Sequence, residues 1–191
     1  MKKVMMIAAM MLMSIGAFAQ EAGQMFVKPM VGGTLATFSG DGVSHTKMKF
    51  GLVAGGEFGY MLTEKLGATA GLLYSMQGSG VKDSDDKWKT EYLNIPILLN
   101  YYVAPGFAVK AGVQPGFLTK AKAGDVDMKD YMNKFDFSIP MGLSYEFNDF
   151  VIDARYNLGL SNILKDKNGT HWDAKARNSV IMLTLGYKIP F

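Results

Sequence analysis

The stretch FDFSIPMGLSYEFNDFVIDARYNLGLSN, residues 135–162, decides the fold. From 135 to 147 every odd-numbered residue is aromatic or aliphatic, whereas the even-numbered residues are mostly polar or small. Neighbouring side chains of a strand point to opposite faces, so this alternation predicts a strand with one apolar face. After Asn148 and Asp149 the apolar residues move to even-numbered positions. A two-residue turn that pairs Phe147 with Phe150 requires this exchange, so the stretch predicts a tight antiparallel hairpin.

The same alternation recurs along the chain after Gln20, with glycines and turn residues between the runs and no helical periodicity. The runs predict eight strands at 25–38, 48–60, 66–77, 91–103, 107–119, 135–147, 150–162 and 179–191. The connections after the second, fourth and sixth strands are short, and the others are long and polar. Short turns at one end and long loops at the other are typical of outer-membrane barrels. We therefore predict an all-β fold, an eight-stranded antiparallel up-and-down transmembrane β-barrel.

Periodicity alone also fits a soluble β-sandwich or a lipocalin-like barrel with an apolar interior. The polar face here is rich in glycine, serine and charges of both signs, which suits a narrow interior, and aromatic residues lie near the strand ends, as in membrane girdles. The apolar face is therefore predicted to contact lipid. Unpaired backbone groups are costly in hydrocarbon, so the sheet must close. Eight strands enclose a lumen that side chains can fill, so we expect no open solute pore.

Charged residues occur at several positions on the face that is predicted to line the lumen. They are Lys28, Lys49, Lys110, Arg155 and Lys188, with Glu57, Asp136, Glu146 and Asp153. Most of them fall toward the short-turn, periplasmic end. Because buried charges are costly unless paired, we expect an ion-paired plug that stiffens the interior rather than a catalytic or transport site.

Prolines interrupt several of the predicted strands. They are Pro29, Pro96, Pro115, Pro140 and Pro190. Proline cannot donate a hydrogen bond to a β-ladder and is disfavoured inside a sheet. We expect these residues at local bulges or at strand ends.

Residues 1–19 resemble a secretory signal peptide, and residues 20–191 are predicted to form the barrel domain. Lys2 and Lys3 precede an uncharged run at 4–13, and Ala-Phe-Ala at 17–19 offers a cleavage site. That run falls short of the roughly 20 residues that a membrane-spanning helix needs. The chain has no cysteine, which excludes disulfides and a lipoprotein anchor. Past the signal the charge is near neutral, which argues against nucleic acid as a partner.

Four segments, YLNIPILLNYY, VKAGVQPGFL, DFSIPMGLSYEF and DARYNLGLSNI, resemble the PorT-like family of Gram-negative outer-membrane β-barrel proteins. The resemblance implies an outer-membrane location, lipid and lipopolysaccharide contacts, and assembly by the barrel-insertion machinery. The family's namesake takes part in protein secretion, so secretion or surface partners are also implied. The final LGYKIPF is similar to an outer-membrane assembly signal, carried by Tyr187, Ile189 and Phe191.

Residues that could carry chemistry are few. His45 and His171 fall in predicted loops without a strand-borne partner, and DSDD at 83–86 lacks the spacing of a calcium loop. We therefore predict no catalytic, cofactor or metal site, and a non-enzymatic protein with a surface-interaction or envelope-integrity role. Its extracellular loops are predicted at 39–47, 78–90, 120–133 and 163–176. The alternatives are an accessory component of a secretion system and a lipid-modifying enzyme that uses His171 and Ser161.

Overall fold

The computed structural model describes residues 21–40, 46–81, 87–124, 126–163 and 176–191. The predicted signal peptide, His45, His171 and the DSDD segment lie outside the described residues. The strands are β1 Met25–Ser39, β2 Thr46–Met61, β3 Leu66–Val81, β4 Lys87–Asn94, β5 Ile97–Ala104, β6 Phe107–Ala123, β7 Val126–Asp127, β8 Phe135–Phe147, β9 Phe150–Gly159, β10 Arg177–Tyr187 and β11 Ile189–Pro190. A 3₁₀ turn, η1, spans Lys129–Tyr131. Within the described residues no helix is long and apolar enough to cross a membrane.

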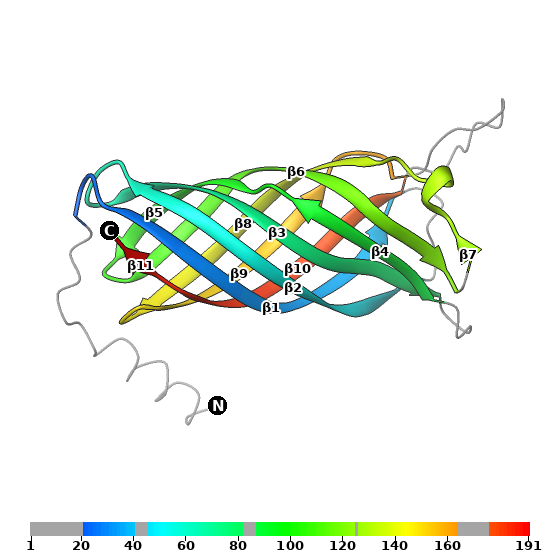
Figure 1. Ribbon diagram of the computed structural model, residues 1–191, viewed down its shortest axis with the longest axis horizontal. Helices are drawn as coiled ribbons and strands as arrows, with labels where there is room; N and C mark the ends of the chain where they lie inside the picture. The colour runs from blue at the N-terminus through cyan, green and yellow to red at the C-terminus, as the bar shows by residue number, and fades with distance from the viewer. Residues whose placement is uncertain (1–20, 41–45, 82–86, 125, 164–175) are drawn as a thin grey trace, which may run out of the picture.

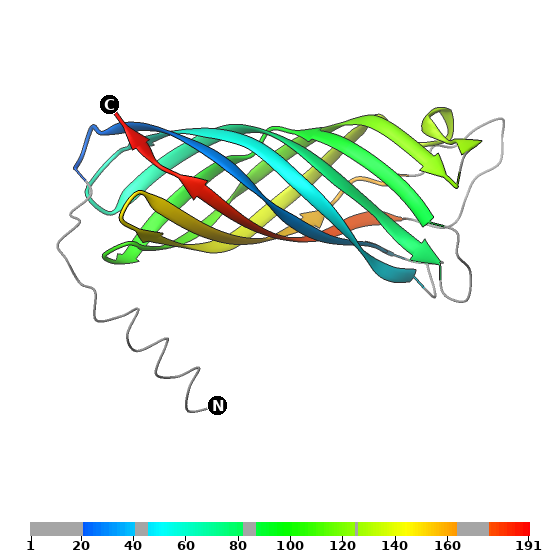
Figure 2. The ribbon, with the colours of Figure 1, turned by 60° about the horizontal axis from the view of Figure 1, so that its bottom comes forward.

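The strands form one antiparallel sheet that closes on itself (Figure 1). The pairing order is β10-β9-β8-β6-β4-β3-β2-β1, β5 also pairs with β3 and β6, and β10 and β11 pair with β1 to complete the ring, as Figure 2 shows. We call each strand position in the barrel wall a stave. β4 and β5 together occupy one stave and β10 and β11 occupy another, so the wall has eight staves, and β7 pairs antiparallel with the end of β6. The predicted eight-stranded up-and-down barrel is confirmed.

Exposure alternates along the staves as the sequence predicts. Leu143 is 48% exposed on the outer wall, whereas its neighbour Ser144 is 2% exposed inside. The hairpin between β8 and β9 pairs Phe147 with Phe150, and Asn148 takes a positive φ of 52°. Asparagine is among the few residues other than glycine that tolerate this conformation. The apolar face therefore lies outside and the polar face inside.

The predicted strand 91–103 is divided where prolines interrupt the ladder. The run 91–103 is broken between Asn94 and Ile97, so β4 and β5 replace one strand. Pro96 lies in this gap, and Pro115 lies on β6 opposite it, where its carbonyl accepts the backbone N–H of Ile95 at 2.8 Å. Because neither proline has an N–H to donate, the ladder is interrupted on both strands at the same level.

The other prolines also occupy interruptions. Pro29 lies in the gap between the β1–β11 pairing, which ends at Val27, and the β1–β10 pairing, which begins at Met30. Pro140 lies where the β6–β8 pairing is interrupted, and Pro190 ends β11. Pro96 and Pro190 therefore lie at strand ends, as expected, whereas Pro29, Pro115 and Pro140 lie inside β1, β6 and β8, each where the pairing on one side of its strand is interrupted.

Several strands continue beyond their predicted ends. β3 reaches Val81 and β6 reaches Ala123, and η1 and β7 occupy part of the segment predicted as a loop at 120–133. In contrast, the predicted strand 150–162 ends early, at Gly159. The alternation of apolar and polar residues marks only the part of a strand that contacts lipid. Backbone hydrogen bonds can extend a strand beyond the lipid into water, where the outward residues need not be apolar. The long loops at 78–90 and 120–133 are correspondingly shorter than predicted.

The interior is layered, as the inward residues of β1 show in order from the short-turn end. Phe26 belongs to an apolar layer with Met61, Tyr102 and Ala108. Lys28 follows in a charged layer, and Met30 belongs to a second apolar layer with Val53, Leu73 and Met182. Phe38 packs against a third apolar cluster of Tyr92, Leu118, Ala121, Met132, Ile163 and Ala176. The charged layer therefore lies between apolar layers.

Candidate functional site

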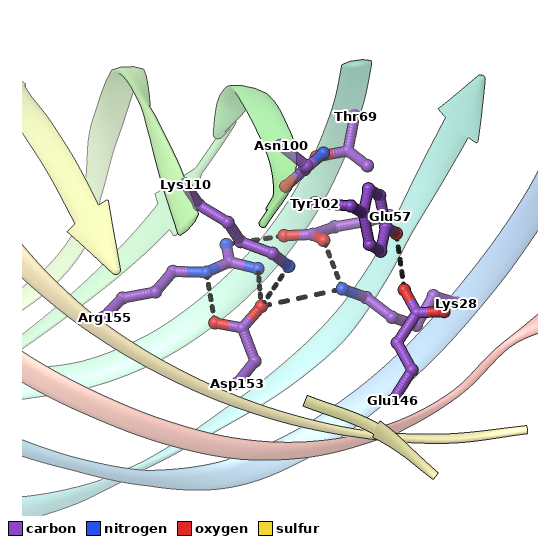
Figure 3. A network of polar contacts seen from close by, with 9 residues as sticks. All are labelled: Lys28, Glu57, Thr69, Asn100, Tyr102, Lys110, Glu146, Asp153 and Arg155. Carbon is purple, nitrogen blue, oxygen red and sulfur yellow. Dashed lines mark hydrogen bonds and ion pairs between the residues drawn. The ribbon is translucent and has the colours of Figure 1, made fainter. Parts of the chain in front are cut away.

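The charged layer joins side chains from four staves in one network (Figure 3). Its members are Lys28 on β1, Glu57 on β2, Lys110 on β6, and Asp153 and Arg155 on β9. Each of these side chains is at most 5% exposed. Alternation places all five on the inner face, because each occupies an inward position of its strand.

Asp153 is the most connected member of the network. Its Oδ2 accepts a hydrogen bond from Lys110 Nζ at 2.5 Å and lies 3.7 Å from Lys28 Nζ. Arg155 donates to both carboxylate oxygens, through Nε at 2.6 Å and through the Nη2 atom at 2.8 Å. This two-point contact fixes the orientation of the guanidinium as well as its charge.

Glu57 holds the other side of the network. Its Oε2 lies 2.8 Å from Lys28 Nζ, and its Oε1 lies 2.5 Å from the Nη1 atom of Arg155. Arg155 and Lys28 therefore each contact both carboxylates. Three cations surround two carboxylates, so the network carries one net positive charge.

A second group of contacts lies next to the network, toward the short turns. Lys188 Nζ lies 2.9 Å from Glu146 Oε2, and the Tyr102 hydroxyl donates to Glu146 Oε1 at 2.5 Å. The Lys188 ammonium also lies 4.6 Å from the centre of the Phe26 ring. Figure 3 shows Glu146 and Tyr102 beside the main network. Tyr102 was not singled out from the sequence, although its inward position on the 91–103 run was the signal available.

The two remaining lumen charges lie toward the long loops and make different contacts. Asp136 accepts a hydrogen bond from the side-chain amide of Asn178 at 2.9 Å. Lys49 Nζ donates to the backbone carbonyls of Gln77 and Trp88, at 2.9 and 3.1 Å. The structure thus gathers the charges predicted near the periplasmic end and leaves Lys49 and Asp136 apart from them.

The chemistry that this network can perform is limited by its own contacts. Both carboxylates are engaged by cations, so neither offers a free base, and burial denies water access to them. Within the described residues, no group of three histidine, aspartate or glutamate side chains is placed to hold a metal. The geometry is that of a rigid interior plug.

The residues of the predicted assembly signal lie on the outer wall beside β1. Tyr187, Ile189 and Phe191 are exposed, and the Phe191 ring lies 6.2 Å from the ring of Phe58 on β2. The backbone N–H of Phe191 donates to Met25 O at 3.0 Å, which ties the end of the last stave to the start of the first. Recognition by the insertion machinery stays a prediction.

Comparison with solved structures found barrels of the same architecture. The chain is 14% identical to Neisserial surface protein A, with a TM-score of 0.54, covering 86% of this chain and 97% of that one. It is 17% identical to OprG from Pseudomonas aeruginosa, with a TM-score of 0.53, covering 91% and 99%. It is 15% identical to Ail, the attachment invasion locus protein of Yersinia pestis, with a TM-score of 0.50, covering 88% and 99%. At these identities the likeness shows the fold.

Comparison at the level of sequence identifies the family. A search of curated proteins found no match. The model of the outer membrane protein beta-barrel domain matches residues 18–165, which is most of the chain. The match covers β1 to β9 and thus all members of the charged network. The chain therefore belongs to the outer membrane protein beta-barrel domain family, whose place is the outer membrane.

Proposed function

We propose that this protein is a closed, non-enzymatic outer-membrane barrel that acts at the cell surface through its long-loop end, in surface interaction or envelope integrity. The charged network carries the proposal. Its five side chains come from staves spread over more than half of the ring and contact one another across the lumen, each at most 5% exposed. A solute would have to separate buried ion pairs to pass this level, and that is costly.

The names of two structural neighbours support a role at the surface. One is an attachment invasion locus protein and the other is a surface protein. In this chain the long connections gather at one end, which leaves the loop end and the outer wall for contacts. Lipopolysaccharide is the partner that every outward-facing group at that end would meet.

The absence of a solute pathway is testable in vesicles. Liposomes that contain the refolded barrel should swell in arabinose or glycine at the rate of protein-free liposomes, because the charged layer blocks the lumen. A general diffusion porin is the positive control. Swelling that rises in proportion to barrel content would contradict the closed barrel.

The PorT-like resemblance supports a second role, as an accessory component of a secretion system. Mild-detergent purification from the native envelope separates the two, because an accessory component should retain secretion proteins and a free-standing barrel should not. A lipid-modifying enzyme would be revealed by lipid A or phospholipid turnover. Such turnover, lost in His45→Ala/His171→Ala, would overturn the non-enzymatic proposal.

A further inference from the structure

We propose that a recess between β8 and β9, at the long-loop end, binds the phosphorylated sugar headgroup of an outer-leaflet glycolipid. The proposal rests on the proposed function, since it requires the long loops to lie at the cell surface. It assigns a ligand class and a position on the barrel to what is otherwise a general surface role. The position, the lining chemistry and the neighbouring aromatic residues support it separately.

The recess lies where the two strands separate. Regular pairing of β8 with β9 stops at Ser138 and Gly159, and one further backbone bond follows, from the Leu160 N–H to Phe137 O at 2.8 Å. Beyond that point the backbone N–H of Phe137 donates to the Ser161 hydroxyl at 2.8 Å, so a side chain replaces the carbonyl that a regular ladder would supply.

The edges of this opening are held by asparagine contacts. The Asn133 side-chain amide donates to Asn162 O at 2.7 Å, and the Asn162 Oδ1 atom accepts the backbone N–H of Ala176 at 3.1 Å. The backbone N–H of Asn133 also donates to Ile163 O at 2.9 Å. The opening is therefore a built feature of the rim and not a frayed strand end.

The space left by this separation has the size and lining of a small-ligand site. Its volume is about 610 Å³, inside the usual range of roughly 300–1,000 Å³ for such sites. It is lined by Met132, Asn133, Lys134, Phe135, Ser161 and Asn162. Amide and hydroxyl groups match sugar hydroxyls, and the exposed Lys134 supplies a cation for a phosphate.

The height of the recess on the barrel wall favours a lipid ligand over a free sugar. Phe135 lines the recess and also packs edge-to-face with Phe117 on the outer wall, with ring centres 5.7 Å apart. Both rings are about half exposed, at 48% and 47%. Aromatic residues on the outer wall of a barrel mark the membrane interface. A headgroup in the recess would therefore place its acyl chains against these rings.

Lys134 is the residue on which the test turns. The full-length barrel in phosphatidylcholine nanodiscs is titrated with diphosphoryl lipid A, and binding is followed by native mass spectrometry. Loss of a charge-assisted hydrogen bond predicts roughly tenfold weaker binding for Lys134→Gln, and Lys134→Arg should retain binding because it keeps the cation. Lys65→Gln, in a short turn at the opposite end, is the matched control and should bind as the unmodified protein does.

Two other ligands test whether the recess prefers a glycolipid to an anionic phospholipid or to a free phosphorylated sugar. Phosphatidylglycerol and the deacylated glucosamine disaccharide phosphate are titrated in parallel, and both should bind much more weakly than lipid A. Equal binding of phosphatidylglycerol, or no effect of Lys134→Gln on a variant that keeps its heat-modifiable gel migration, would overturn the glycolipid site. Equal binding of the free disaccharide would overturn the lipid assignment. If lipid A does not bind but the liposomes stay tight to solutes, only the proposed recess site is refuted. If the liposomes leak, the closed barrel is refuted.

Discussion

Replacement of Asp153 by asparagine is expected to lower the free energy of unfolding by about 3–5 kcal/mol, the usual cost of leaving a buried charge without its partner. Asp153 contacts three cations inside the barrel, and its loss leaves Glu57 as the single carboxylate in the network. The net charge of the network then rises from one to two positive charges. Urea unfolding in lipid vesicles, followed by circular dichroism, measures the change.

Two further variants separate the network from general effects of the substitution. Asp149→Asn removes a carboxylate from an exposed short turn, where it accepts the Tyr187 hydroxyl at 3.1 Å, and should cost less than about 1 kcal/mol. Adding Lys110→Met to Asp153→Asn restores the original net charge and should recover part of the lost stability, as coupled neighbours do. A double variant no more stable than Asp153→Asn alone would show that charge balance is not what the network provides.

Introduction of arginine at Leu183 is expected to cost about 2–4 kcal/mol, because a cation at mid-bilayer depth must leave water. Leu183 is 56% exposed near the middle of the last stave, which runs from β10 to β11. The same vesicle unfolding measurement applies. A water-exposed wall would accept arginine at this position with little loss.

Depth provides the control for this prediction. Val103 is similarly exposed, at 52%, but lies next to the short turn at the end of β5, where arginine should cost about 0–1 kcal/mol. Equal costs at Leu183 and Val103 would argue against a membrane belt around the barrel. An inward position such as Ser144 is a poor control, because its 2% exposure leaves no room for arginine beside the charged layer.

The strand pattern and the inside–outside assignment could be predicted from the sequence because both follow from period-two alternation. The hairpin at Asn148 and Asp149 was predicted to the residue, since the exchange of parity across it admits one pairing of Phe147 with Phe150. The strand ends could not be predicted, because hydropathy is set by lipid and the ladder by backbone hydrogen bonds. The prolines at positions 96 and 29 indicated where the pairing could be interrupted. The partner strand affected at each position could be identified only from the register.

The candidate site was predictable in part for the same reason. The odd or even position of a residue in its strand places Glu57 and Arg155 on the inner face. It does not give their positions along the barrel axis or their separation around the ring. Their contact depends on closure, because β9 reaches β2 only through β10 and β1. The recess between β8 and β9 was not predicted, because Ser161 was named only as a residue of a possible lipid-modifying enzyme and Asn162 only as the end of the predicted strand 150–162.

The charged network also bears on how long a folded barrel survives. Its members come from the first two strands and from β6 and β9, so the network is complete only after distant parts of the chain have met. Contacts of such long sequence separation form late in folding. Interactions that are absent from the transition state slow unfolding without speeding folding. The network is therefore expected to act chiefly as a kinetic lock, extending the lifetime of each barrel after insertion.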